Sequence, residues 1–137
     1  MAKLLGRDEI LAAVDVQTIR VPVPEWGGEV LVRALTGRER DKFEESLMVQ
    51  TTGKGGRVQR RMRWQNARAR LCAMSIVDEQ GRCLFTAEDV QALGEKGAAA
   101  LQRVYDVAAS LSGLSGADLD ELLGNSKSDQ GDDSPSD

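Results

Sequence analysis

Two short segments near the N-terminus, residues 19–23 and 30–34, place apolar side chains at every second position. This alternation predicts strands with one buried face. The intervening turn, Glu25–Gly28, ends in two glycines that are free to adopt positive φ, so we expect the two segments to form a β-hairpin. Because Pro22 and Pro24 cannot donate ladder hydrogen bonds, the first strand is expected at a sheet edge.

Beyond this hairpin, apolar residues recur at the spacing of a helix. Thr36 followed by Glu39 is typical of a capping box, so a helix is expected to begin there and to end near Gln50. The glycine-rich stretch that follows predicts a flexible basic loop over about residues 51–58. The other expected elements are helices over about residues 8–14, 62–76, 86–93 and 98–111, an extended corner or small hairpin over 76–85, and a last short helix opening at Ser115.

These elements predict an α+β fold, with a small N-terminal β-hairpin followed by a mainly helical bundle. One folded domain over residues 1–124 accounts for them. Residues 125–137 read NSKSDQGDDSPSD and contain no aliphatic or aromatic side chain. Such a segment cannot bury enough apolar area to offset the entropy of ordering it, so a disordered acidic C-terminal tail is expected.

Composition excludes several kinds of chemistry. The chain contains no histidine, which excludes Ser-His-Asp and Cys-His catalysis and zinc sites built from Cys and His. Its two cysteines, Cys72 and Cys83, have no metal-ligand spacing and are expected to be reduced, with Cys72 packed into a helix face. No stretch approaches the roughly 20 apolar residues of a membrane span, and the start lacks a signal sequence, so we expect a soluble protein without membrane contact.

Charge is distributed unevenly along the chain. Residues 1–70 hold 14 basic and 9 acidic side chains, whereas residues 71–137 hold 4 and 13. No acidic residue occurs between Ser46 and Val77, a stretch that contains Lys54, Arg57, Arg60, Arg61, Arg63, Arg68 and Arg70. This stretch could bind a phosphate backbone, or it could balance an acidic surface, including the chain's own tail. The net charge of −4 and the lack of a nucleic-acid motif do not favour nucleic acid as the partner.

No catalytic or cofactor motif is present. Lys54 lies among glycines, but a phosphate-binding loop needs two glycines four residues apart and a Gly-Lys-Ser/Thr ending before a helix. The acidic pairs at 44–45, 88–89 and 120–121 fall on expected exposed helix positions, and the tail acids at 129, 132 and 133 lack a metal-binding loop. We therefore expect no enzymatic activity, no cofactor and no metal.

Several segments nevertheless match a known pattern. The most telling are Pro24-Glu25-Trp26-Gly27-Gly28, Leu35-Thr36-Gly37 with Glu39-Arg40, Val77-Asp78 with Gly81, and Leu84-Phe85-Thr86. Over about residues 4–126, the chain resembles the tail assembly chaperones of long-tailed bacteriophages and prophages. None of these segments is a catalytic signature, so the resemblance is one of overall pattern.

The resemblance implies a small non-enzymatic protein that binds the tape-measure protein and keeps it soluble until tail-tube subunits polymerise around it. The resemblance also implies possible contact with the tail-tube protein and possible self-association. It further implies that the protein acts in the host cytoplasm and is absent from the mature virion. Many family members have a longer frameshifted form. The competing interpretations are a structural virion or tail component, and a nucleic-acid-binding regulator that uses the basic segment 54–70.

A chaperone of this kind needs apolar grooves between amphipathic helices. We expect the helices over 62–76 and 98–112 to form such a groove, with Trp26 near its rim. Trp26 either packs on the helix that carries Phe43, the favoured interpretation, or serves as an exposed anchor. The candidate partner-binding residues are Trp26, Phe43, Trp64, Leu71, Leu101 and Tyr105.

Overall fold

The alternating N-terminal segments form a hairpin of strands β1 (Thr18–Val23) and β2 (Gly28–Arg33) in the computed structural model, which describes residues 2–114. The strands pair antiparallel with Val21 opposite Val30. Strand β5 (Ile76–Val77) pairs with the other side of β2, giving the order β1-β2-β5. The proline-containing strand β1 therefore lies at the sheet edge, as predicted.

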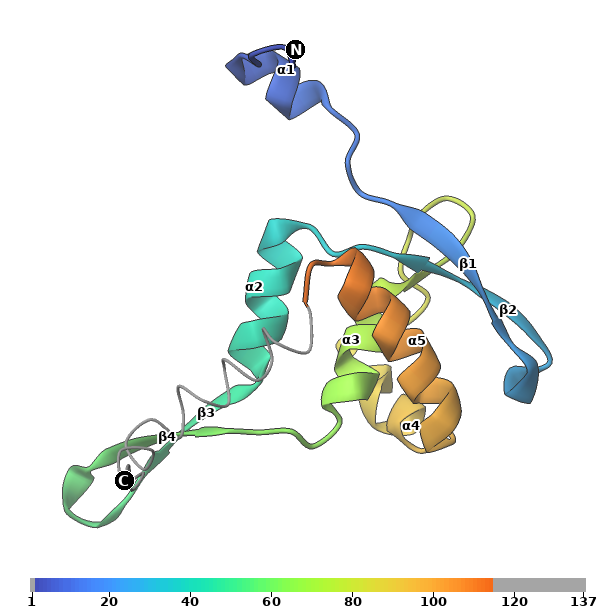
Figure 1. The fold of residues 1–137 in the computed structure, drawn as a ribbon. Helices are drawn as coiled ribbons and strands as arrows, with labels where there is room; N and C mark the ends of the chain where they lie inside the picture. The colour runs from blue at the N-terminus through green and yellow to red at the C-terminus, as the bar shows by residue number, and fades with distance from the viewer. Residues whose placement is uncertain (1, 115–137) are drawn as a thin grey trace, which may run out of the picture.

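Four helices follow, and three of them pack together beside this sheet (Figure 1). Helices α3 and α5 pack against each other, α4 contacts α3, and α5 also contacts β1 and β2. The bounds are α2 (Gly37–Ser46), α3 (Ala67–Ser75), α4 (Val90–Gly94) and α5 (Ala98–Leu111), with a short 3₁₀ turn η3 (Ala87–Asp89) before α4. The α+β class is confirmed, but the arrangement of the helices is not clearly a bundle.

The core is aliphatic and rich in alanine, as the scarcity of aromatic residues predicts. Phe43, Leu71, Cys72 and Val104 are fully buried, together with aliphatic side chains from β1 and β2. Burial raises the pKa of the Cys72 thiol to about 12, which keeps this thiol protonated and unreactive at neutral pH. Both cysteines are free, and Cys72 packs into a helix face as expected.

Two helix boundaries were predicted correctly from their capping residues. Thr36 accepts a hydrogen bond from the Glu39 backbone N–H, and the Glu39 carboxylate accepts one from the Thr36 N–H. Thr86 and Asp89 form the same kind of reciprocal cap at η3. Helix α5 occupies the predicted range, and residues 76–85 form the expected extended corner, closed by an isolated bridge between Val77 and Cys83.

The segment between α2 and α3 differs from the prediction. Strands β3 (Met48–Thr52) and β4 (Val58–Met62) form a second hairpin around the 3₁₀ turn η2 (Lys54–Gly56). The expected continuation of a helix to Gln50 and the helix start at 62 are therefore wrong, and the turn over residues 53–57 is shorter than the loop expected over 51–58. The β-branched residues of both strands and the positive φ values of the turn glycines favour a hairpin, and these signals outweigh the helical spacing.

The first helix, α1 (Arg7–Ala12), stands apart from the rest of the molecule and buries none of its residues (Figure 1). Leu4 and Val14 on either side of it are more than 90% exposed, at 94% and 96%.

Within residues 2–114, no helix is both long enough and apolar enough to cross a bilayer. In the same range, no three Cys, Asp or Glu side chains come together in a way that could hold a metal ion. The predicted helix at Ser115, the domain boundary at 124 and the acidic tail lie outside the described residues.

Candidate functional site

Three hollows surround η3 and α4, and we call this surface the α4 face. The largest encloses about 470 Å³ between the tip of the β1–β2 hairpin and α4, where Trp26, Phe85, Ala92 and Leu93 line it. The exposed lining area of this hollow comes mostly from apolar atoms, and Asp89 and Lys96 stand at its edge. An apolar floor with charged groups around it suits the apolar side chains of a partner.

A second hollow of about 370 Å³ lies on the other side of Phe85. Ala73 and Met74 of α3 and Val90 of α4 contribute apolar surface, and Arg70 also lines it. Phe85 is half-buried, packs against the core and lines both hollows.

The position of Trp26 is set by the hairpin turn and by one ion pair. The 3₁₀ turn η1 (Pro24–Trp26) ends at Gly27, whose φ of 80° suits glycine. Next to Trp26, the Glu25 carboxylate accepts hydrogen bonds of 2.6 and 2.9 Å from both terminal nitrogens of Arg103 on α5. These hydrogen bonds lower the pKa of Glu25 from 4.5 to about 2 and connect the hairpin tip to α5.

Trp26 does not pack on the helix that carries Phe43. The hairpin tip and α2 lie on opposite sides of the molecule (Figure 1), and half-buried Trp26 lines the hollow beside α4. The favoured sequence interpretation was therefore wrong, because no sequence signal shows that α4 reaches the turn.

The third hollow, of about 200 Å³, lies between the N-terminus of α3 and the C-terminal end of α4. Trp64 lines it and is 37% exposed. Asn66, with a φ of 58°, ends the extended chain before α3 begins, so Trp64 precedes the helix and does not join its apolar stripe. Lys96 lines both this hollow and the one beside Trp26.

The other four predicted partner-binding residues lie in the core. Phe43 and Leu71 are fully buried, and Leu101 and Tyr105 are 6% and 7% exposed. Helices α3 and α5 pack directly against each other, and where a hollow borders both of them it lies at their N-terminal ends, lined by Ala67, Ala69, Ala98 and Leu101. Of the six predicted residues, Trp26, Trp64 and the nearly buried Leu101 line hollows of the α4 face.

Two residues of this surface, Phe85 and Ala92, were not predicted. A usable signal was present, because Leu84 and Phe85 directly precede the Thr86 cap without belonging to any helical stripe. Ala92 carries no such signal, since an exposed alanine on a short helix has no distinguishing pattern.

The acidic pairs have structural roles where they are described. Glu44 pairs with Arg40 at 3.0 Å, and Asp89 caps η3 through the Thr86 N–H. Arg68, from the basic segment, lies 5.7 Å from the centre of the Tyr105 ring and donates a hydrogen bond to Gln102. These side chains stabilise the fold, and the α4 face offers a binding surface.

A family model described as phage tail assembly chaperone matches residues 9–130. The chain belongs to this family. The match covers the whole α4 face, both hairpins and the first part of the acidic C-terminal segment, so the resemblance seen in the sequence is confirmed. No curated protein and no solved structure matches the chain.

As a member of the phage tail assembly chaperone family, the chain has a role in the assembly of phage tails. Interaction with tail proteins follows from that role.

Proposed function

We propose that this chain binds the tape-measure protein of its phage or prophage and keeps it soluble until tail-tube subunits polymerise around it. Family membership supports the assembly role, and the α4 face supports the mode of binding. The observation that carries the proposal is the placement of three partly exposed aromatic side chains, Trp26, Trp64 and Phe85, around one short helix.

A long helical client presents apolar side chains at helical spacing, and shallow apolar hollows accept such anchors. Tryptophan is enriched among residues that dominate binding energy, because it buries a large rigid surface. In this proposal the protein acts without enzymatic activity in the host cytoplasm and leaves before the virion is complete. Contact with the tail-tube protein and self-association belong to the same proposal.

Co-expression with the tape-measure protein of the same phage or prophage tests this function. We expect the tape-measure protein to be insoluble alone, and to become soluble and to co-purify when this chain is present. If it neither binds nor becomes soluble, the proposed client is wrong. Detection of the chain in purified particles by mass spectrometry would instead support the structural-component interpretation.

A pair of α4 variants tests the surface. Ala92→Glu places a carboxylate in the hollow beside Trp26, and Gln91→Glu adds the same charge to an adjacent exposed position that does not line it. We expect Ala92→Glu to reduce co-purification at least tenfold, because an apolar contact then requires burial of an unpaired charge. Gln91→Glu should bind like the wild type, and equal behaviour of the two variants would exclude the α4 face.

A further inference from the structure

The β3–β4 hairpin carries several positive charges and no negative one. Lys54, Arg57, Arg60 and Arg61 lie on it, Arg63 follows directly, and no acidic residue occurs between Ser46 and Val77. Within residues 2–114, none of these five side chains is in an ion pair. This surface therefore has positive charge without a described counter-charge.

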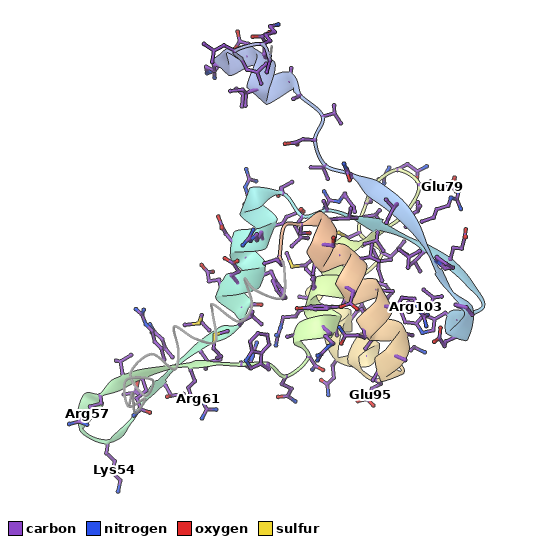
Figure 2. The ribbon with its side chains drawn as sticks, in the orientation of Figure 1. Lys54, Arg57, Arg61, Glu79, Glu95 and Arg103 are labelled. Carbon is purple, nitrogen blue, oxygen red and sulfur yellow. The ribbon has the colours of Figure 1, made fainter. Side chains whose placement is uncertain are left out.

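The hairpin extends away from the body and exposes these charges in several directions. Lys54, Arg57 and Arg61 project from the hairpin into open space (Figure 2). Arg60 pairs with Gln50 and Arg61 with Val49, so the two arginines are adjacent on β4 and point to opposite faces.

The positive surface continues from the hairpin to the body. Arg63 lies close enough to Arg70 that its charge, together with burial, lowers the pKa of the Arg70 guanidinium. One terminal nitrogen of Arg70 is buried without a hydrogen-bond partner among the described residues. An acidic segment along this path would relieve repulsion between like charges.

The same chain contains an acidic segment within reach of the hairpin. Residues 125–137 hold four aspartates, at 129, 132, 133 and 137, against one lysine. The described chain ends at Leu114 beside α2, where Arg40 donates a hydrogen bond to the Gly113 carbonyl, and β3 follows soon after α2. Helix α2 and the hairpin together span roughly 35 Å. The short helix that the sequence predicts over about 115–124 adds about 15 Å, and residues 125–137 can extend over about 40 Å, which is enough to reach the hairpin.

We propose that residues 125–137 dock on the β3–β4 hairpin of the same chain and cover its positive charge. Individual exposed ion pairs contribute at most about 1 kcal/mol each, so the segment would bind weakly as a separate peptide. A tether of this length provides an effective concentration on the order of millimolar, which makes weak pairing sufficient. This inference holds whether or not the tape-measure protein is the client.

The test uses the full-length ¹⁵N-labelled chain and two variants that remove four carboxylates each. The tail variant changes the four aspartates of residues 125–137 to asparagine. The control changes Asp8, Asp15, Glu79 and Glu95 to their amides, and Glu79 and Glu95 lie on the body, away from the hairpin (Figure 2). We expect the amide signals of residues 48–62 to shift in the tail variant and to stay in place in the control. Unchanged hairpin signals in the tail variant would overturn the proposal.

Salt and protein concentration identify the partner of the hairpin. Raising ionic strength from about 0.05 M to about 0.5 M should move the wild-type hairpin signals toward their positions in the tail variant, because exposed charges are screened. The reciprocal variant, Arg57→Gln with Arg60→Gln and Arg61→Gln, should shift signals of residues 125–137. Dependence of the shifts on protein concentration would assign the contact to a second copy and overturn the proposal. The proposal would also be overturned if the hairpin signals shift when a DNA duplex is added but are unchanged in the tail variant.

Discussion

Glu25 and Arg103 lie 78 residues apart in the chain, yet their two hydrogen bonds join the turn that carries Trp26 to α5. Neither charge attracts notice in the sequence, because exposed Glu and Arg side chains are common. The pair is exposed, and it connects the hairpin tip to α5. Trp26, the next residue in this turn, lines the hollow of about 470 Å³ beside α4.

The Glu25 carboxyl should titrate far below the usual range. Its pKa in the folded chain is about 2 against an ordinary 4.5, so the pair contributes to stability above pH 4.5 and this contribution is lost as pH falls through about 2. Carboxyl ¹³C chemical shifts followed by NMR measure this directly. Arg103→Gln should return the midpoint toward 4.5, whereas Arg38→Gln, which removes a different exposed charge, should leave it near 2.

Gly94 lies where α4 approaches α3. A Cβ atom at this position would lie 2.4 Å from Asn66 Oδ1, so Gly94→Ala must displace the end of the Asn66 side chain. Because the displaced atom belongs to a side chain and alanine has the higher helix propensity, we expect a loss of no more than about 1 kcal/mol in the free energy of unfolding. Chemical denaturation monitored by circular dichroism measures it. Gly37→Ala is the control, because nothing lies within 4 Å of its added Cβ, and this variant should be neutral or slightly stabilising.

At the scale of elements, the sequence predicts those helices and strands whose ends and spacing are set by residues within the segment itself. Helix α5, the capped starts of α2 and η3, and the β1–β2 hairpin follow from periodicity, capping residues and turn glycines within each segment. The β3–β4 hairpin was missed because its apolar residues also fit helical spacing. The α4 face could not be predicted as a surface, since it joins segments as distant as Trp26 and Phe85, and only tertiary packing brings them together.

The β3–β4 hairpin should depend on its turn and little on the body. Gly55 and Gly56 both have a φ of 78°, where alanine costs on the order of 1 kcal/mol or more per residue. The double variant Gly55→Ala and Gly56→Ala should lose hydrogen-exchange protection at residues 48–62 while the midpoint of thermal unfolding stays nearly constant. Gly53→Ala is the control, because Gly53 has an ordinary φ of −91°. Protection that survives the double change would show that the body holds the hairpin.

At the scale of the whole molecule, residues 2–114 form one body that carries two appendages. The β1-β2-β5 sheet and helices α2 to α5 share the core, whereas α1 and the outer part of the β3–β4 hairpin extend away from it (Figure 1). The appendages hold the exposed aliphatic residues of the N-terminus and the unpaired positive charges. This division fits an assembly chaperone, because a stable body can present surfaces that stay free for partners.

The division predicts two very different responses to substitution of apolar residues. Phe43→Ala removes a fully buried ring from the body, and we expect it to cost about 3–5 kcal/mol in the free energy of unfolding. Ile10 and Leu11 on α1 are 56% and 68% exposed, so Ile10→Ser with Leu11→Ser should change that free energy by no more than about 0.5 kcal/mol. Urea denaturation at two protein concentrations measures both effects. A large, concentration-dependent loss in the α1 variant would show that this helix is buried between copies, because only an assembled form could give its aliphatic side chains a role in stability.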